Sequence, residues 1–283
     1  MRAARQSDNA FTLVETMIGT VIVVLLGGIV YTLLNLGMTL YAQNVSLGQT
    51  HSNGLEATEK LYLKIAAAEE TPALTDDTGA TLTGNGPSAG VRFYNLGSPL
   101  TYQVIVPVSA AAYSMTLSKT GIQPQPQVGD KITMADLGFQ GVITSITSLA
   151  GTHTLWFASP IGDGFVPSKF LGIVIPSGSK CFLLQPTAFI SVGSVLRHYP
   201  RAMSVAEDGS SAFNNPANFV AISSLLPLAS QTNAFPFQYL GASRRSIDVN
   251  LRLRSPAYGG KVDNFYAYQN LKTTVAHRSS VIR

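Results

Sequence analysis

The hydrophobic pattern divides the chain into an apolar first part and a longer remainder of short alternating segments. From Thr16 through Leu55 there is no Asp, Glu, Lys or Arg, and the run from Met17 to Met38 is almost wholly apolar or small. As a helix this run rises about 33 Å, which is enough to cross a bilayer. The pattern therefore predicts a transmembrane helix over about residues 16–38.

The helix is predicted to continue beyond the membrane. Val45, Leu55, Leu61 and Ile65 fall on one repeating face, while the charged residues of this segment fall elsewhere. Such spacing is typical of an amphipathic helix. We expect one helix over residues 11–70.

After residue 70 no long helical period recurs, and short β-rich runs alternate with Gly, Pro and Asn breaks. This texture predicts a mainly β second part. The expected strands are Val91–Asn95, Thr101–Val106, Lys131–Met134, Gly141–Thr147, Thr152–Ala158, Phe170–Pro176, Cys181–Gln185, Val192–Tyr199, Phe219–Ser223, Phe235–Tyr239, Ser246–Arg254 and Leu271–Arg278.

One block of this β part has the pattern of an insertion. The segment from Val128 to Gly162 predicts three strands, and the Pro-rich "GIQPQPQ" precedes it. We expect a small β-barrel-like subdomain over residues 108–170, inserted into a β domain formed by residues 71–107 and 171–283.

The residues before the span give its orientation. Arg2 and Arg5 precede the apolar run, so the N-terminus is expected in the cytoplasm and the β part outside the inner membrane. A secretory signal peptide is disfavoured, because the run is too long, no small-x-small site follows it, and Glu15 stands at its start. A plain single-pass anchor stays open, although it leaves residues 7–16 unexplained.

The segment "AFTLVE", Ala10 to Glu15, follows a short polar and basic leader. This arrangement resembles the cleavage and methylation motif of type IV prepilins and of the pseudopilins of type II secretion. The resemblance implies that residues 1–10 are a leader peptide and that prepilin peptidase cuts between Ala10 and Phe11. It also implies N-methylation of Phe11. The family usually has Gly before the cut, and Ala10 is the mildest departure from it.

The resemblance further implies an α+β fold, in which the second half of a long N-terminal helix packs on an antiparallel sheet. It implies other pilin or pseudopilin subunits and the inner membrane as partners, with a final place in a periplasmic or extracellular filament. The segment from Phe235 to Arg283 is more loosely similar to the ending of the larger minor pilins and pseudopilins. The length of the chain also favours a minor subunit.

Glu15 is costly beside a hydrocarbon segment, and such carboxylates are usually functional and paired. After cleavage the nearest cation is the α-amino group of Phe11, in the same subunit or its neighbour. That pairing would fix the axial register between subunits. The alternative is that Glu15 lies in the headgroup layer without a specific role.

Glycines interrupt the span, and each costs about 1 kcal/mol against Ala in a helix in water. Gly27 and Gly28 are our candidates for a soft point, since this region of pilins can unwind. Close packing between helices explains the pair nearly as well.

Composition and motifs add little chemistry. The net charge is +4, and Arg252 and Arg254 alternate with apolar residues, which favours a solvated strand face over nucleic-acid binding. The single cysteine, Cys181, is expected to be a buried, inert thiol. Asp76-Asp77 and Asp163 fit solvated turns better than a calcium loop.

The four histidines, His51, His153, His198 and His277, are far apart in the sequence and lack metal spacing. No catalytic or nucleotide-binding fingerprint occurs, so we expect neither an enzyme nor a cofactor. The sequence thus predicts a structural minor pilin or pseudopilin subunit of a type IV pilus or a type II secretion pseudopilus. The alternative is a non-polymerising, membrane-anchored extracytoplasmic binding domain.

Overall fold

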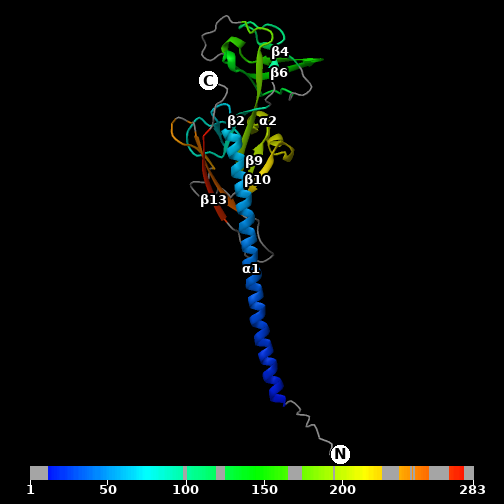
Figure 1. Cartoon of the computed structure of the whole chain (residues 1–283), viewed down its shortest axis with the longest axis vertical. Helices are drawn as coiled ribbons and strands as arrows, with labels where there is room; N and C mark the ends of the chain where they lie inside the picture. Colours follow the sequence, from blue (N-terminus) through cyan, green and yellow to red (C-terminus); the bar gives the residue numbers. More distant parts are fainter. Residues whose placement is uncertain are drawn as a thin grey trace, which may run out of the picture.

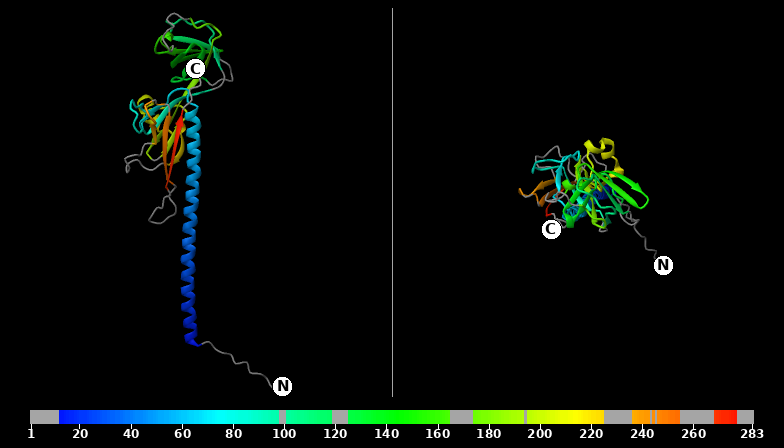
Figure 2. Two further views of the ribbon diagram at one scale, coloured as in Figure 1. Left: turned by 60° about the vertical axis from the view of Figure 1, so that its left-hand side comes forward. Right: turned by 90° about the horizontal axis from the view of Figure 1, so that it is seen from above.

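The fold is α+β, with one long N-terminal apolar helix and antiparallel β-sheets (Figure 1). A computed structural model describes residues 12–97, 101–118, 125–164, 174–193, 195–224, 236–242, 244, 246–254 and 268–276. The helix forms a rod whose lower part stands alone, while its upper part lies against a β body (Figures 1 and 2). A further β unit, built mainly from the described residues between Tyr102 and Gly164, lies at the end of the molecule opposite the N-terminus. It is drawn mostly in green, and we call it the green unit.

Helix α1 is Leu13–Ala66, 54 residues without interruption, close to the predicted range. Its buried face was predicted only in part. Leu61 and Ile65 are fully buried, but Val45 and Leu55 are 39% and 53% exposed, so their assignment to the packed face was wrong. Small residues make the first half of that face instead, because helix and sheet come close together there. The buried set is Ala42, Ser46, Thr50, Gly54, Ala57, Leu61 and Ile65.

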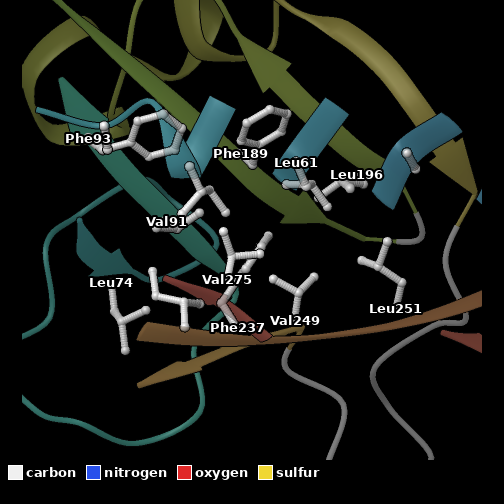
Figure 3. Packing of buried hydrophobic residues seen from close by; sticks show 14 of the residues in the cluster. Leu61, Leu74, Val91, Phe93, Phe189, Leu196, Phe237, Val249, Leu251 and Val275 are labelled. Carbon is white, nitrogen blue, oxygen red and sulfur yellow. The ribbon is translucent and has the colours of Figure 1, made fainter. Parts of the chain in front are cut away.

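The β body packs on α1 with two sheets. A three-stranded sheet, in the order β11-β12-β13, meets α1 mainly through β13, and part of a larger sheet approaches through β10. Leu61 of α1, Val91, Phe189 and Val275 belong to one buried cluster between helix and sheets (Figure 3). The strands of this body are β1 (Ala73–Thr75), β2 (Gly90–Leu96), β8 (Lys180–Val192), β9 (Val195–Tyr199), β10 (Val220–Ser224), β11 (Phe237–Tyr239), β12 (Ser246–Arg254) and β13 (Tyr268–Ala276).

The green unit has a hydrophobic core of its own. This core includes Met115, Leu117, Phe139 and Leu155, and it extends from Tyr102 to Leu183 along the chain. It therefore draws on residues before and after the predicted insertion 108–170, whose status as a separate subdomain stays a prediction. The elements are β3 (Tyr102–Gln103), β4 (Ser114–Ser118), β5 (Lys131–Met134), η1 (Ala135–Leu137), β6 (Phe139–Leu149), β7 (Thr152–Phe157) and η2 (Ile161–Gly164).

Strand β8 belongs to both cores. Cys181 and Leu183 lie in the core of the green unit, whereas Phe189 lies in the core under α1. On one edge β8 pairs with β2 over seven residue pairs, and on the other it pairs first with β5 and then with β9. One 13-residue strand thus connects the two parts of the molecule.

Two ion pairs join the parts where β5 begins. Arg201, which follows β9, donates from both terminal nitrogens to the carboxylate of the fully buried Asp130, at 2.6 and 2.9 Å. Lys131 Nζ lies 2.6 Å from both carboxylate oxygens of Glu70, just beyond the end of α1. Because one charge of the first pair is fully buried, removing its partner would leave a costly unpaired carboxylate.

Short helical turns complete the described chain. They are α2 (Val205–Asp208), α3 (Ser210–Phe213) and η3 (Pro216–Asn218), and none was predicted. Phe213 of α3 stacks on Tyr199 at a centroid distance of 5.0 Å and closes a small third core with Ala188 and Ile190.

Candidate functional site at the start of the N-terminal helix

The helix begins with a capping box at Thr12 and Glu15. Thr12, in an extended conformation, is the N-cap, and its Oγ1 accepts a hydrogen bond from the Glu15 backbone N–H at 3.3 Å. In return, Glu15 Oε2 accepts from the Thr12 N–H and from the Thr12 hydroxyl, each at 2.9 Å. These bonds satisfy backbone donors that the first helical turn leaves free.

The capping box changes the interpretation of Glu15. Its carboxylate has a partner within its own chain, and the charge lies at the positive end of the helix dipole. Among the described residues, Oε1 accepts no hydrogen bond and stays available to a neighbour. Glu15 was predicted from the sequence as a functional residue and Thr12 was not, although the pattern Thr-x-x-Glu before an apolar run is a known helix-start signal.

Beyond the cap, α1 exposes a long apolar surface. Every residue from Thr12 to Tyr41 is exposed, including Leu13 at 78% and Val24 at 72%. Within the described part of the chain, α1 is one helix that by length and composition could cross a membrane. The apolar half could therefore anchor the protein in a membrane.

The threonine hydroxyls of this half are satisfied within the helix. Thr20 Oγ1 donates to the Thr16 carbonyl at 2.7 Å, and Thr32 Oγ1 donates to the Gly28 carbonyl at 2.8 Å. Thr39 makes the same bond to Asn35. In hydrocarbon an unsatisfied polar group is expensive, so this local pairing suits a helix exposed to lipid.

The predicted soft point at Gly27 and Gly28 is ordinary α-helix in this structure, within the unbroken span of α1. A Cβ atom at either glycine would meet nothing within 4 Å. Gly28 instead belongs to a shallow notch in the helix surface, which is lined by Val24, Leu25, Gly28, Ile29, Thr32 and Leu33. A second helix could approach closely at such a notch.

Comparison with known proteins gives no family. No family model matches the chain, and no curated protein matches it. Among solved structures, the phage phi92 endosialidase aligns at 10% sequence identity with a TM-score of 0.21. The alignment covers 69% of this chain and 36% of that protein, so this chain matches little more than a third of its length. A TM-score this low carries no structural argument.

The predicted cleavage site lies outside the described residues. Ala10, Phe11 and the leader with Arg2 and Arg5 precede Thr12, the first residue that the structure describes. The cleavage, the methylation and the pairing of Glu15 with Phe11 therefore remain predictions.

The other candidate side chains do not gather into a site. Within the described ranges, no group of three or more His, Cys, Asp or Glu residues could hold a metal ion. Asp76 Oδ1 instead accepts hydrogen bonds from Thr78 and from the Ala80 N–H, which closes a turn and lowers the pKa of the Asp76 carboxyl despite partial burial. His277 lies outside the described residues.

Cys181 is buried, as predicted, and burial raises the pKa of its thiol to about 12. A thiol with such a pKa is almost never a thiolate at neutral pH, and the thiolate is the reactive form. Cys181 is therefore a core residue of β8 and no nucleophile.

Proposed function

We propose that this chain is a structural minor subunit of a type IV pilus or of a type II secretion pseudopilus. It is made as an inner-membrane precursor, cut before Phe11 by prepilin peptidase, and assembled with other subunits through α1. The proposal rests on the prepilin-like motif from Ala10 to Glu15 together with one structural observation. That observation is the division of α1 into an exposed apolar half and a half that packs on a sheet.

In water, the apolar surface of the exposed half of α1 would have to be covered by another molecule. In a membrane, lipid covers it. Its large apolar side chains are half exposed or more, from Leu13 at 78% to Leu40 at 50%. Burying apolar surface from water yields about 25 cal/mol per Å². In a filament, neighbouring helices replace the lipid that covers this half in the precursor. The notch at Gly28 gives one place for close contact between helices.

Glu15 has two roles in this proposal. In the free subunit its Oε2 closes the capping box with Thr12. In the filament its charge pairs with the methylated α-amino group of Phe11 and fixes the axial register. The two roles are separable, because Gln also closes a capping box but carries no charge.

Processing is the first test. Mass spectrometry of the protein from the membrane fraction of cells that express prepilin peptidase should find Phe11 as an N-methylated first residue. A retained leader with unmethylated Phe11 would reject the proposal. It would favour a membrane-anchored binding domain that never polymerises.

A series of variants tests the register role. Glu15→Gln keeps the cap and removes the charge, Thr12→Ala weakens the cap and keeps the charge, and Glu15→Ala removes both. We expect Glu15→Gln and Glu15→Ala to lose most incorporation into filaments, and Thr12→Ala to lose far less. The helix start should be weakened by about 1 kcal/mol in Thr12→Ala. All three should insert into the membrane normally.

The matched control is Glu56→Ala. Glu56 is a glutamate on the same helix whose side chain is 62% exposed and forms an i,i+4 ion pair with Lys60. Surface pairs of this kind contribute little, so incorporation should be unchanged. If Glu15→Gln is incorporated as well as the wild type, the charge of Glu15 is not needed for assembly, and Glu15 acts only as a capping residue.

A further inference from the structure

One sheet face of the green unit has a regular composition. The outward residues of β4, β7 and β6 align in three cross-strand rows, as the strand register requires. All nine are partly or fully exposed, while the alternating inward residues, such as Leu117, Leu155 and Ile143, belong to the core. We name this set the hydroxyl face. Its rows are Ser114, Trp156 and Ser145; Thr116, Thr154 and Thr147; and Ser118, Thr152 and Leu149.

The hydroxyl face is uncharged and carries one aromatic ring. Besides Trp156 and Leu149, every member is Ser or Thr, and none is ionisable. Thr116 and Thr154 are linked hydroxyl to hydroxyl at 3.2 Å. With the usual spacings of a sheet, the face measures about 14 Å along the strands and about 10 Å across them.

Trp156 stands on the solvent side of this sheet. It is the chain's single tryptophan and is 44% exposed, whereas its neighbours Leu155 and Phe157 point into the core. A β-bulge between Ile143 and Ser145 lies opposite, and Thr144 Oγ1 donates to the Trp156 carbonyl at 3.0 Å. Bulges often re-aim a side chain at a functional surface. The backbone at Trp156 is thus held by the pairing with β6 and by the hydrogen bond from Thr144.

We propose that the hydroxyl face binds a neutral saccharide. A pyranose ring presents apolar C–H groups on one side and hydroxyls around its rim. The indole of Trp156 offers the apolar platform, and the Ser and Thr hydroxyls both donate and accept hydrogen bonds to the rim. Water can bridge the remaining gaps at little cost.

Charge and composition decide against the other classes of ligand. A nucleic acid or an acidic glycan gains its affinity largely from cations, and none of the nine residues supplies one. A protein partner prefers aromatic residues, Met and Arg, and protein interfaces are depleted in Ser. A neutral, hydroxyl-bearing ligand matches a neutral, hydroxyl-bearing face.

The position of the face suits such contact. The green unit with β4 and β6 lies at the end of the molecule farthest from the N-terminus (Figures 1 and 2). If α1 is anchored in a membrane or a filament, this unit extends away from it. Saccharide binding by this face does not require the chain to polymerise. It is therefore tested separately from the proposed role as a pilus or pseudopilus subunit.

The single tryptophan makes the test direct, because all indole fluorescence comes from this face. The full chain, in a detergent without a sugar headgroup, is titrated with cellohexaose, maltohexaose and a hexamer of N-acetylglucosamine. Oligogalacturonate and single-stranded DNA are the charged probes. We expect a saturable change of the Trp156 emission with at least one neutral hexasaccharide and none with the charged probes.

Variants then locate the contact by calorimetry. Trp156→Ala should bind at least about tenfold more weakly, the loss expected for a Trp anchor. Thr154→Val, which removes one hydroxyl at nearly constant volume, should bind about two- to tenfold more weakly. The matched control is Tyr62→Ala, an aromatic residue of α1 that is 51% exposed, and it should bind as the wild type does. Unchanged melting temperatures of the variants verify that they fold.

Three results would overturn the proposal. They are no saturable change with any neutral hexasaccharide, stronger binding of a charged probe, and full binding by a folded Trp156→Ala protein. The Thr154→Val variant keeps the proposal testable even if Trp156→Ala fails to fold.

Discussion

His198 on β9 shows how a single buried ring couples stability to pH. It stacks on Phe189 with ring centroids 4.6 Å apart, and its Nε2 is buried without a hydrogen-bond partner among the described residues. Burial, with smaller contributions from Lys64 and Lys60 of α1, lowers the pKa of His198 to about 4. The folded protein therefore keeps this ring neutral where an exposed histidine would be charged.

The prediction at the scale of a residue concerns the protonation of His198. An unfolded chain protonates it near pH 6.5, while the folded state resists until about pH 4. The free energy of unfolding should therefore fall as the pH drops from 6.5 to 4, because the unfolded state binds more protons there. Above pH 6.5 this contribution is constant.

Urea denaturation of the wild type and His198→Phe at pH 7.5, 5.5 and 4.5 measures the effect. The variant keeps the stacking ring but cannot bind the proton, so its unfolding free energy should decline less steeply. Carboxylates titrate equally in both proteins and cancel in the difference. Parallel curves for the two proteins would show that His198 does not resist protonation in the folded state.

At the scale of elements, the packing of α1 on its sheet depends on Gly54. A Cβ atom there would lie 2.4 Å from Leu253 Cδ1 and 2.5 Å from Leu271 Cδ1. The glycine therefore sits where Leu253 of β12 and Leu271 of β13 leave no room for a side chain on the helix. Gly48, on the same helix, is exposed and has nothing within 4 Å of its Cβ position.

We predict opposite effects for the two glycines. Gly54→Leu should lower the free energy of unfolding by about 1–3 kcal/mol or more, because the added side chain overpacks the contact. Gly48→Leu should raise it by up to about 1 kcal/mol, because Leu is a better helix former and meets open space. Urea denaturation followed by circular dichroism checks both. Equal effects of both substitutions would contradict the contact at Gly54.

The elements also show what the sequence could and could not predict. Strand ranges such as Lys131–Met134 and Ser246–Arg254 agree with β5 and β12, because alternation of side chains is local information. Thr101–Val106 shrank to the two residues of β3. Strand β4 was missed, although its sequence Ser-Met-Thr-Leu-Ser alternates polar and apolar residues. Part of Phe170–Pro176 lies outside the described residues.

The predicted strand Cys181–Gln185 stops before Pro186, whereas β8 continues through Pro186 to Val192. The Pro186 carbonyl accepts from the Ala202 N–H at 2.9 Å, on the side away from β2. The backbone nitrogen of a strand residue faces the same side as its carbonyl, and there β8 pairs with no strand between Leu184 and Ala188. Pro186 therefore breaks no ladder bond. The unpaired stretch of this edge, between the partners β5 and β9, depends on which strands pair in the folded protein, and the local sequence does not reveal it.

The candidate site, too, was predicted from the sequence only in part. Glu15 and the apolar run could be found in sequence, because charge and hydropathy are residue properties. Thr12, the partner of Glu15 within the chain, was not predicted, although the Thr-x-x-Glu spacing of a capping box is also local information. The hydroxyl face was not found, because its rows depend on how three strands pair, which no local pattern contains.

At the scale of the whole molecule, the apolar half of α1 contributes no buried residue to the β body. The first buried position of the helix is Ala42. We therefore predict that a chain of residues 40–283 folds without a membrane or detergent. Its urea midpoint should match that of the full chain in mild detergent, because the described residues that it lacks, 12–39, are all exposed.

Circular dichroism and size-exclusion chromatography of the two proteins provide the comparison. A markedly lower midpoint for residues 40–283 would mean that the exposed half of α1 stabilises the body after all. Aggregation with loss of the cooperative transition would have the same meaning.

The shared strand β8 also has a mechanical consequence. A pull on the green unit is transmitted to the body through a hydrogen-bonded strand, with no loose linker in series along that path. Pulling along β8 loads the seven pairs with β2 together in shear, so they must slide past one another rather than open one at a time. A ligand bound at the far end, as proposed for the hydroxyl face, could thus be pulled without separating the green unit from the body.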